Sequence, residues 1–360
     1  MNELQRHLQE MIRAQGPISV ANYMALALGH PRHGYYMTQN PFGAQGDFIT
    51  APEISQMFGE LIGLWCVQRW RNMGAPREFL LCELGPGRGT LMADALRAAR
   101  ISEDFLNAAQ LHLVETSRAL REVQQSIIQR PIIWHDRAVD LPALPALVIA
   151  NEFFDALPIH QYVHMADGWH ERMVTHDPQT DQFGFTLSPL PGASDGAFPA
   201  ALRHAPIGAV AELCPAGQAI VTDLASHIAE HGGAALVIDY GSERSAPGDT
   251  FQAVRRHGYC DPLQNPGLAD LTAHVDFESL ARAAQAAGCS TEGPVEQGKF
   301  LLRLGLAARA GRLAQNATAE EQSALVSAFH RLTGSDQMGR LFKALALRHP
   351  SLPPSPGFEA

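Results

Sequence analysis

Cysteine is scarce in this sequence, and the few cysteines that occur are scattered. The 360 residues include five of them, an odd number, with no CxxC pair and no Cys/His cluster. Disulfide frameworks and structural zinc sites both need closely spaced partners of that kind. We therefore expect reduced thiols. The pairs His30/His33 and His227/His231 lack a nearby third ligand, so no metal site is predicted.

Positive charge and long apolar runs are also in short supply. Lys and Arg number 27 against 37 Asp and Glu, which gives a formal net charge of −10. Nucleic-acid binding depends on clustered Lys and Arg, so nucleic acid is not an expected partner, although modest acidity is also an ordinary means of staying soluble. No apolar run approaches the roughly 20 residues that cross a bilayer, and the first 13 residues lack the apolar core of a signal peptide. We expect a cytoplasmic globular protein without membrane insertion.

The most informative stretch that is present is the octapeptide ELGPGRGT, Glu83–Thr90. An apolar run over residues 79–82 precedes it, and residues 91–96 follow it with helical spacing. Glycines let a backbone turn tightly and approach a ligand, and the free N–H groups of a helix start face that ligand. The pattern predicts a nucleotide-binding turn between a buried strand and a helix.

Apolar runs and helical segments alternate on either side of this turn. Strands are expected at 79–82, 111–115, 131–134, 147–150 and 235–241, with helical segments between them. Such alternation predicts right-handed crossovers and a parallel sheet covered on both faces, which is a doubly wound α/β core. Ligands of such folds bind beyond the carboxyl ends of the strands, where Glu83, Glu115 and Asn151-Glu152 all fall.

The outer parts of the chain carry weaker patterns. Thr50 and Glu53 have the spacing of a capping box ahead of a long helix. The other expectations are a β-hairpin insertion (159–213), a Pro/Gly-rich loop (242–270), a strand near 300–304, helices over 319–348 and a frayed tail (350–356). The expected domains are an N-terminal helical region with a loop that covers the cofactor (1–75), the core (76–158 and 214–310), the β-rich insertion (159–213), and C-terminal helices and tail (311–360).

The glycine spacing and one acidic residue distinguish between nucleotides. Gly85, Gly87 and Gly89 depart from the G-x-G-x-x-G spacing of dinucleotide sites. Glu83, just before them, is awkward beside a pyrophosphate, yet it suits S-adenosylmethionine, which carries an ammonium group and no phosphates. Glu115 is placed to accept the ribose hydroxyls, a role that an acidic residue also has in NAD folds. S-adenosylmethionine is therefore the predicted cofactor.

The octapeptide NEFFDALP, Asn151–Pro158, follows the fourth strand, where we expect the methyl group and its acceptor to meet. Methyl transfer is an in-line displacement, so an enzyme mainly has to align the reactants. The carboxylates of Glu152 and Asp155 can hold a guanidinium or take a proton from the acceptor. A structural role, in which either carboxylate only fixes the loop by hydrogen bonding, stays open.

Four separated motifs together resemble the MidA-like methyltransferases, the bacterial relatives of mitochondrial complex I assembly factor 7. They are Gly46–Ser55, Glu83–Thr90, Asn151–Pro158 and Ile238–Gly241, within a resemblance that runs from about Gly16 to Leu304. It implies the Rossmann-like class I fold and S-adenosylmethionine-dependent activity. From the mitochondrial members it further implies methylation of an arginine in a subunit of respiratory complex I. The Gly46–Thr50 segment would then reach over the cofactor near the acceptor.

These arguments define one site and leave several functions open. The expected catalytic residues are Glu152, Asp155 and Asp47, and the expected cofactor-binding residues are Gly46, Glu83, Gly85, Pro86, Gly87, Gly89, Glu115 and Asn151. The expected partner is a protein with a target arginine, such as a complex I subunit, and a homodimer is left open. Three alternatives remain: methylation of a small molecule, an assembly or binding protein with a vestigial cofactor site, and an NAD-dependent oxidoreductase.

Overall fold

The chain folds into two compact units. The computed structural model describes residues 2–38, 50–192 and 198–359. The first unit comprises Met1–Phe48, Asp155–Gln218 and Arg244–Ser279, and the second comprises Ile49–Phe154, Ala219–Glu243 and Leu280–Ala360. Each unit is therefore assembled from three separate segments of the sequence. Among the described residues, no helix has both the length and the apolar character that a membrane crossing requires.

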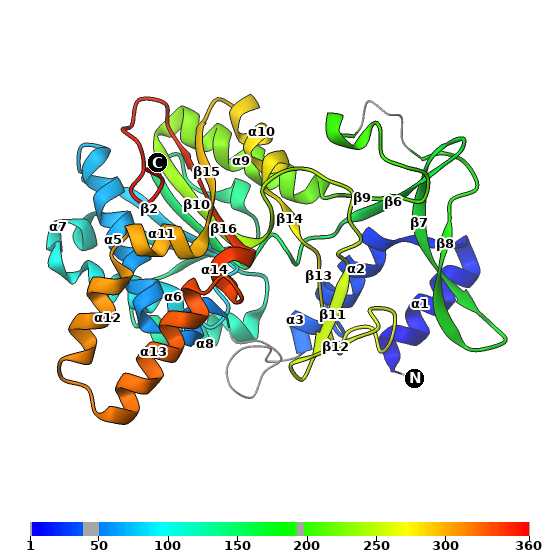
Figure 1. Cartoon of the computed structure of the whole chain (residues 1–360), viewed down its shortest axis with the longest axis horizontal. Coiled ribbons are helices and arrows are strands. Elements are labelled where there is room, and N and C mark those ends of the chain that lie inside the picture. Colours follow the sequence, from blue (N-terminus) through cyan, green and yellow to red (C-terminus); the bar gives the residue numbers. More distant parts are fainter. Residues whose placement is uncertain (1, 39–49, 193–197, 360) are drawn as a thin grey trace. The chain divides into compact units, whose positions relative to one another are not determined.

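A mixed sheet forms the centre of the second unit (Figure 1). Across the sheet the strands are β15 (Ser290–Glu296), β16 (Phe342–Arg348), β10 (Gly233–Ser242), β5 (Ala146–Asn151), β2 (Phe79–Leu84), β3 (Ala109–Val114) and β4 (Ile133–His135). The strands from β10 to β4 pair in parallel, whereas β16 pairs antiparallel with both β10 and β15. The predicted doubly wound α/β fold is confirmed, with an antiparallel edge added to it.

The second unit also contains helices that belong wholly to it. They are α4 (Ala51–Ile54), α5 (Gln56–Asn72), α6 (Thr90–Ala98), α7 (Glu103–Ala108), α8 (Arg118–Ile128), α11 (Gln297–Arg303), α12 (Leu306–Ala314), α13 (Ala319–Thr333) and α14 (Met338–Leu341). Two further helices, α9 (Pro215–His231) and α10 (Phe277–Ala286), contribute residues to both units.

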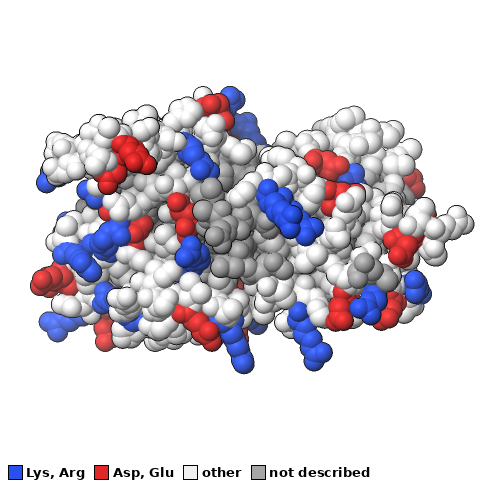
Figure 2. All heavy atoms as spheres, turned by 90° about the horizontal axis from the view of Figure 1, so that it is seen from below, with Lys and Arg blue, Asp and Glu red and all other residues white. Residues whose placement is uncertain are grey.

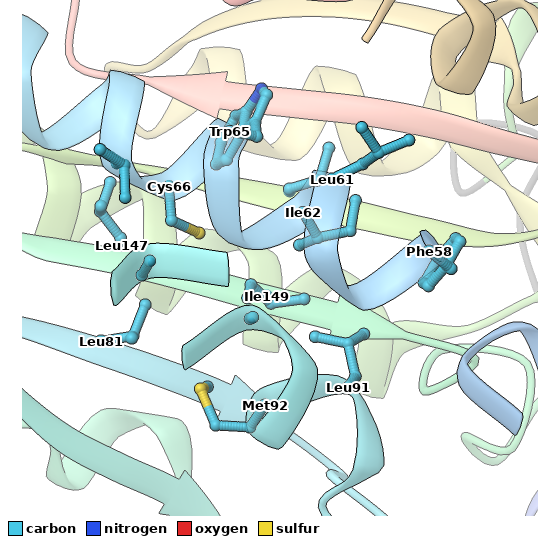
Figure 3. Close-up of a cluster of buried hydrophobic side chains, with 14 of the residues drawn as sticks. Phe58, Leu61, Ile62, Trp65, Cys66, Leu81, Leu91, Met92, Leu147 and Ile149 are labelled. Carbon is cyan, nitrogen blue, oxygen red and sulfur yellow. The ribbon is translucent and has the colours of Figure 1, made fainter. Parts of the chain in front are cut away.

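Helix α5 buries one broad face against the sheet, as its apolar spacing predicts. Figure 3 shows Ile62 of this helix above Ile149 of β5, and Leu91 and Met92 of α6 in the same cluster. The helix approaches α6 closely at Gly63, where a Cβ atom would lie only 2.4 Å from the carbonyl oxygen of Ala95. Burial of this face fixes α6, and with α6 the turn that precedes it.

The predicted capping box at Thr50 is wrong. The Thr50 side chain makes no capping hydrogen bond, and only the four-residue helix α4 follows it. The long helix α5 instead begins after Ser55, whose side chain accepts from the backbone N–H of Met57. The Glu53 side chain does not cap its own helix, and its Oε1 instead accepts a hydrogen bond of 2.7 Å from the Thr90 hydroxyl. Glu53 thus bonds to a residue 37 positions away in the sequence and not to the N–H groups of α4.

The first unit combines helices with two small sheets. Its helices are α1 (Glu3–Gln15), α2 (Val20–Gly29) and α3 (Tyr35–Thr38). One sheet has the order β1 (Ile18–Ser19), β7 (Gly168–Asp177), β6 (His160–Met165) and β9 (Val210–Leu213), with β8 (Gln182–Leu187) paired to β7. The other is β12 (Gly258–Cys260), β11 (Gln252–Arg255) and β13 (Asp270–Thr272). Strands β6 to β9 lie within the predicted insertion (159–213), and the predicted loop over 242–270 contains strands.

Two elements near the C-terminus differ from the predictions. Residues 300–304, predicted as a strand, belong largely to helix α11. Short apolar runs do not distinguish a buried strand from a helix by periodicity alone. Residues 342–348, predicted as helix, form β16, which is buried between two antiparallel neighbours. Since both of its faces are covered, the strand lacks the alternating pattern that would have revealed it.

The tail is docked, not frayed. Arg69 of α5 is fully buried, and its Nη1 donates to the carbonyl oxygens of Pro353 and Pro354, each at 3.0 Å. The backbone N–H of Ser355 donates to Glu292 Oε2 at 2.8 Å. Because these partners lie far from the tail in sequence, the sequence shows only the proline content of the tail, which favours a frayed end.

Candidate functional site

The predicted glycine turn, Gly85–Gly89, joins the carboxyl end of β2 to the first residue of α6. Gly85, Gly87 and Gly89 have φ values of 57°, 53° and 85°, in the left-handed region that favours glycine. The Gly89 N–H donates to the carbonyl oxygen of Pro86 at 2.7 Å and closes the turn. A Cβ atom on Gly85 would lie 2.8 Å from the Phe153 ring. The turn therefore requires glycine both for its backbone conformation and for space.

Glu83 is a buried acid, and one of its carboxyl oxygens has no partner in the described part of the chain. The residue is 3% exposed, and its Oε2 accepts no hydrogen bond from the described residues. Burial raises the pKa of this carboxyl to about 8. On the neighbouring strand β5, the Asn151 Oδ1 atom is likewise buried without a described partner. Unpartnered buried polar atoms are costly, so both atoms point to a polar ligand such as an ammonium group.

Glu115 follows β3 and is held in a fixed position. Its Oε1 accepts from the Ser117 N–H at 2.8 Å, and its Oε2 accepts from Gln124 Nε2 at 3.2 Å. The pKa of Glu115 is nevertheless raised, because burial outweighs these bonds. Gln124 Nε2 also donates to the carbonyl oxygen of Gly87 at 2.8 Å. Gln124 thus links the acid to the glycine turn, a role that no motif in the sequence suggests.

Glu152 directly follows β5 and has an unusual backbone conformation. Its φ of 51° lies in the left-handed region, which costs of order 1–3 kcal/mol for a residue other than glycine. Its Oε1 accepts from the Ala51 N–H at 2.9 Å and from Asn151 Nδ2 at 3.2 Å. Burial raises the pKa of the carboxyl to about 7 despite both bonds. Glu152 therefore fixes the start of α4 and is also poised to change its protonation near neutral pH.

Helix α4 is tied to the glycine turn as well as to Glu152. Besides the bond from Thr90 to Glu53, the Arg88 guanidinium lies 3.8 Å from the second Glu53 carboxylate oxygen. Helix α4, which follows the predicted cofactor cover, is thus held by two carboxylates: Glu152 binds its first N–H, and its own Glu53 contacts Thr90 and Arg88. The cover itself, with the predicted residues Gly46 and Asp47, lies outside the described residues.

Asp155 belongs to the first unit and is described with it. The residue is 7% exposed, and its carbonyl oxygen accepts from the Ala273 N–H at 3.0 Å. In the same unit the Tyr36 hydroxyl donates to Asp270 at 2.8 Å. The pKa of Tyr36 is raised by burial, then by the charges of Asp270 and Asp155. The first unit thus places Asp155 in a buried acidic environment, and its pairing with Glu152 stays a prediction.

The second unit brings most of the predicted site residues to the carboxyl ends of β2, β3 and β5. They are Glu83, Gly85, Pro86, Gly87, Gly89, Glu115, Asn151 and Glu152. No group of three or more His, Cys, Asp or Glu side chains within residues 2–38, 50–192 and 198–359 is arranged to hold a metal ion. The arrangement is suited to a charged organic ligand.

Known proteins resemble this chain over most of its length. The family model described as "Putative S-adenosyl-L-methionine-dependent methyltransferase" matches residues 61–295. The mitochondrial protein arginine methyltransferase NDUFAF7 of Xenopus tropicalis is 38% identical, over 99% of this chain and 89% of the relative. The human protein of that name is 37% identical, over 95% of this chain and 82% of the relative. A Burkholderia thailandensis protein, crystallised with S-adenosyl-homocysteine, is 28% identical with a TM-score of 0.82, covering 99% of this chain and 92% of that chain.

The residues at the carboxyl ends of the strands fit this kind of cofactor. The unpartnered Glu83 Oε2 atom suits the ammonium of the methionine part, and the glycine turn lies directly before the N-terminus of α6, where anionic and polar ligand groups bind readily. Glu115 ends the next strand, as an acid that accepts ribose hydroxyls should. A cofactor with an ammonium group, as the comparisons indicate, is therefore compatible with these buried atoms.

Proposed function

Because this chain belongs to that family of S-adenosyl-L-methionine-dependent methyltransferases, we propose that it methylates an arginine side chain of a protein. The family match and the neighbour bound to S-adenosyl-homocysteine establish the cofactor and the class of enzyme. The choice of arginine is supported by relatives that are named protein arginine methyltransferases and are 37–38% identical over nearly the whole chain.

Three groups of residues would hold the cofactor. Glu83 binds the ammonium, Glu115 accepts the ribose hydroxyls, and Gly85–Gly89 admits the ligand to the start of α6. When bound, S-adenosyl-L-methionine supplies a methyl group on a positively charged sulfur. Asn151, whose Oδ1 is otherwise unpartnered among the described residues, lies at the end of β5 beside this site.

The observation that supplies the reaction with a base is the Glu152 carboxyl, which directly follows β5 and whose pKa burial raises to about 7. Arginine is protonated at every physiological pH, so N-methylation must remove one proton from the guanidinium. A guanidinium nitrogen forms its bond to the methyl carbon as the carbon–sulfur bond breaks, and Glu152 takes the released proton. Glu152 would also bind the guanidinium before transfer, a role that the sequence assigns to Asp155 and Asp47 as well.

The proposed partner is a protein with an exposed arginine, and a subunit of respiratory complex I follows from the resemblance of the motifs. Figure 2 shows Lys and Arg interspersed with Asp and Glu on the face that it displays. On that face no broad acidic surface gathers among the described residues. We assign selection of the arginine to the carboxylates of the site. We propose the bacterial cytoplasm as the location.

A transfer assay tests this proposal. The protein is incubated with methyl-labelled S-adenosyl-L-methionine and an extract of cells that lack this chain, and proteins are then precipitated away from small metabolites. Label in the protein fraction supports the proposal. Label in the metabolite fraction alone would establish a small-molecule methyltransferase. Binding of S-adenosyl-homocysteine without any transfer to the extract would favour a binding or assembly protein.

A further inference from the structure

We propose that Asp239 is a positioning residue, which holds the loop that carries Glu152 against the glycine turn. The loop in question, here the β5 loop, is Glu152–Phe154. Asp239 lies on β10, the neighbour of β5, and its side chain is fully buried. It is separated from the loop by more than eighty residues in sequence. The inference rests on the proposed function only in giving Glu152 its chemical role.

Three consecutive backbone N–H groups of the β5 loop bind to β10. The N–H of Glu152 donates to the carbonyl oxygen of Ile238 at 2.9 Å. The N–H groups of Phe153 and Phe154 both donate to Asp239 Oδ2, at 3.1 Å and 2.9 Å. The other oxygen, Oδ1, accepts from the Tyr240 N–H at 2.9 Å. The Asp239 carboxyl thus accepts from three backbone N–H groups, two of them in the β5 loop.

These bonds explain how Glu152 keeps its left-handed conformation. Such a conformation persists in a residue other than glycine only where its surroundings determine it. The bonds from Phe153 and Phe154 to Asp239 fix the backbone immediately after Glu152. Without them the loop is free to relax toward an ordinary conformation, which would redirect the Glu152 carboxyl.

The same loop touches the cofactor turn directly. The Phe153 ring packs against Gly85 so closely that a Cβ atom added to Gly85 would lie 2.8 Å from Phe153 Cδ2. Any shift of the β5 loop therefore changes the position of Glu152 relative to the bound methyl group. Misplacement of a reacting group by about 1 Å can cost on the order of 100-fold in rate. Asp239 thus controls the alignment of the acceptor side, while the cofactor contacts belong to other residues.

The test compares Asp239→Ala and Asp239→Asn with Asp94→Asn. Asp94 is another buried acid of the second unit, paired with Arg97 on α6, so its variant controls for a general loss of stability. Amide hydrogen exchange of the cofactor-free protein should be faster at Phe153 and Phe154 in Asp239→Ala and unchanged in the control. Asp239→Asn should be intermediate, because its amide oxygen can still accept from both loop N–H groups.

Activity and binding complete the test. We expect kcat for methyl transfer to fall about 10- to 100-fold in Asp239→Ala, with less than about a 3-fold change in the Kd of S-adenosyl-homocysteine. Equal exchange rates and equal kcat in Asp239→Ala and the Asp94 control would overturn the proposal. Should Asp239→Ala not fold, the same comparison is made with Asp239→Asn. If the wild-type protein transfers no methyl group to arginine, the proposed function fails, whereas the exchange data still decide whether Asp239 holds the loop.

Discussion

Glu83 is a neutral acid at neutral pH in the free protein and must become an anion to bind an ammonium group. Its pKa is raised from 4.5 to about 8 by burial. The contribution of Glu83 to the free energy of unfolding is therefore largest below about pH 4.5, and it is lost as the pH rises toward 8. In ligand binding the sign is reversed, because the bound cation favours the ionised form.

Calorimetry can detect this proton. At pH 7, binding of S-adenosyl-homocysteine should release close to one proton, seen as a difference in binding enthalpy between buffers of different ionisation enthalpy. Affinity should rise with pH up to about 8. Glu83→Gln should weaken binding and abolish the proton release. Binding that is independent of both pH and buffer in the wild-type protein would contradict the assignment.

Glu152 predicts a pH dependence for the reaction itself. If it accepts the proton, kcat/KM for the acceptor, measured at saturating S-adenosyl-L-methionine so that Glu83 is already ionised, should rise with pH through about 7. Glu152→Gln should lower the rate by about 100-fold or more and remove this limb of the profile. If Glu152→Gln retains the rise of kcat/KM with pH, Glu152 is not the proton acceptor and has only the structural role given by its hydrogen bond from Ala51.

For single residues, the sequence predicts a role where that role depends on the neighbouring residues in the chain. Glu83 is the last but one residue of β2 and Glu115 directly follows β3, so their place at the carboxyl edge could be inferred from the alternation alone. Gln124 and Asp239 could not be assigned in that way. Their partners, Gly87 and the N–H groups of Phe153 and Phe154, lie 37 residues away or more. Only the folded chain brings them together.

Among the elements, the glycine turn makes a sharp prediction. Gly85→Ala places a Cβ atom against the Phe153 ring, whereas Gly74→Ala, at a similar positive φ, meets open space. Both variants carry backbone strain of about 1–2 kcal/mol. We therefore expect both to lose stability, and only Gly85→Ala to weaken S-adenosyl-homocysteine binding, by tenfold or more. Equal affinities in the two variants would mean that the turn does not contact the cofactor.

The docked tail makes another prediction. Removing residues 351–360 leaves the buried Arg69 without its two proline carbonyl partners and Glu292 without Ser355. Hydrogen bonds to a charged group each contribute about 1.5–3 kcal/mol. Thermal unfolding of the truncated chain should begin several degrees lower, with S-adenosyl-homocysteine affinity little changed. An unaltered unfolding curve would show that the tail contributes nothing to stability.

Elements were predicted best where one pattern dominates. The central strands and α5 have strong apolar periodicity and were placed nearly correctly. The segment 300–304 and the strand β16 were misassigned, because an apolar run of that length suits a helix and a fully covered strand equally well. Burial on both faces removes the very alternation on which a sequence-based assignment relies.

For the whole molecule, the order of strands and helices along the sequence predicts the parallel core. It does not predict where the chain divides into two units. Each unit takes three separate stretches of the chain, with breaks at 48/49 and 154/155 that no composition change marks. The second break falls inside the motif that holds both Glu152 and Asp155. One continuous motif thus supplies residues to both units.

The central claim is that this second-unit site transfers a methyl group to arginine. Its most direct test is mass spectrometry of an acceptor protein labelled by the wild-type protein and methyl-labelled S-adenosyl-L-methionine, with Glu152→Gln as the paired control. We predict that the label resides on a guanidinium nitrogen of arginine and is nearly absent from the control reaction. Label on lysine, on a hydroxyl or on a carboxyl group, formed equally well by both proteins, would contradict the account.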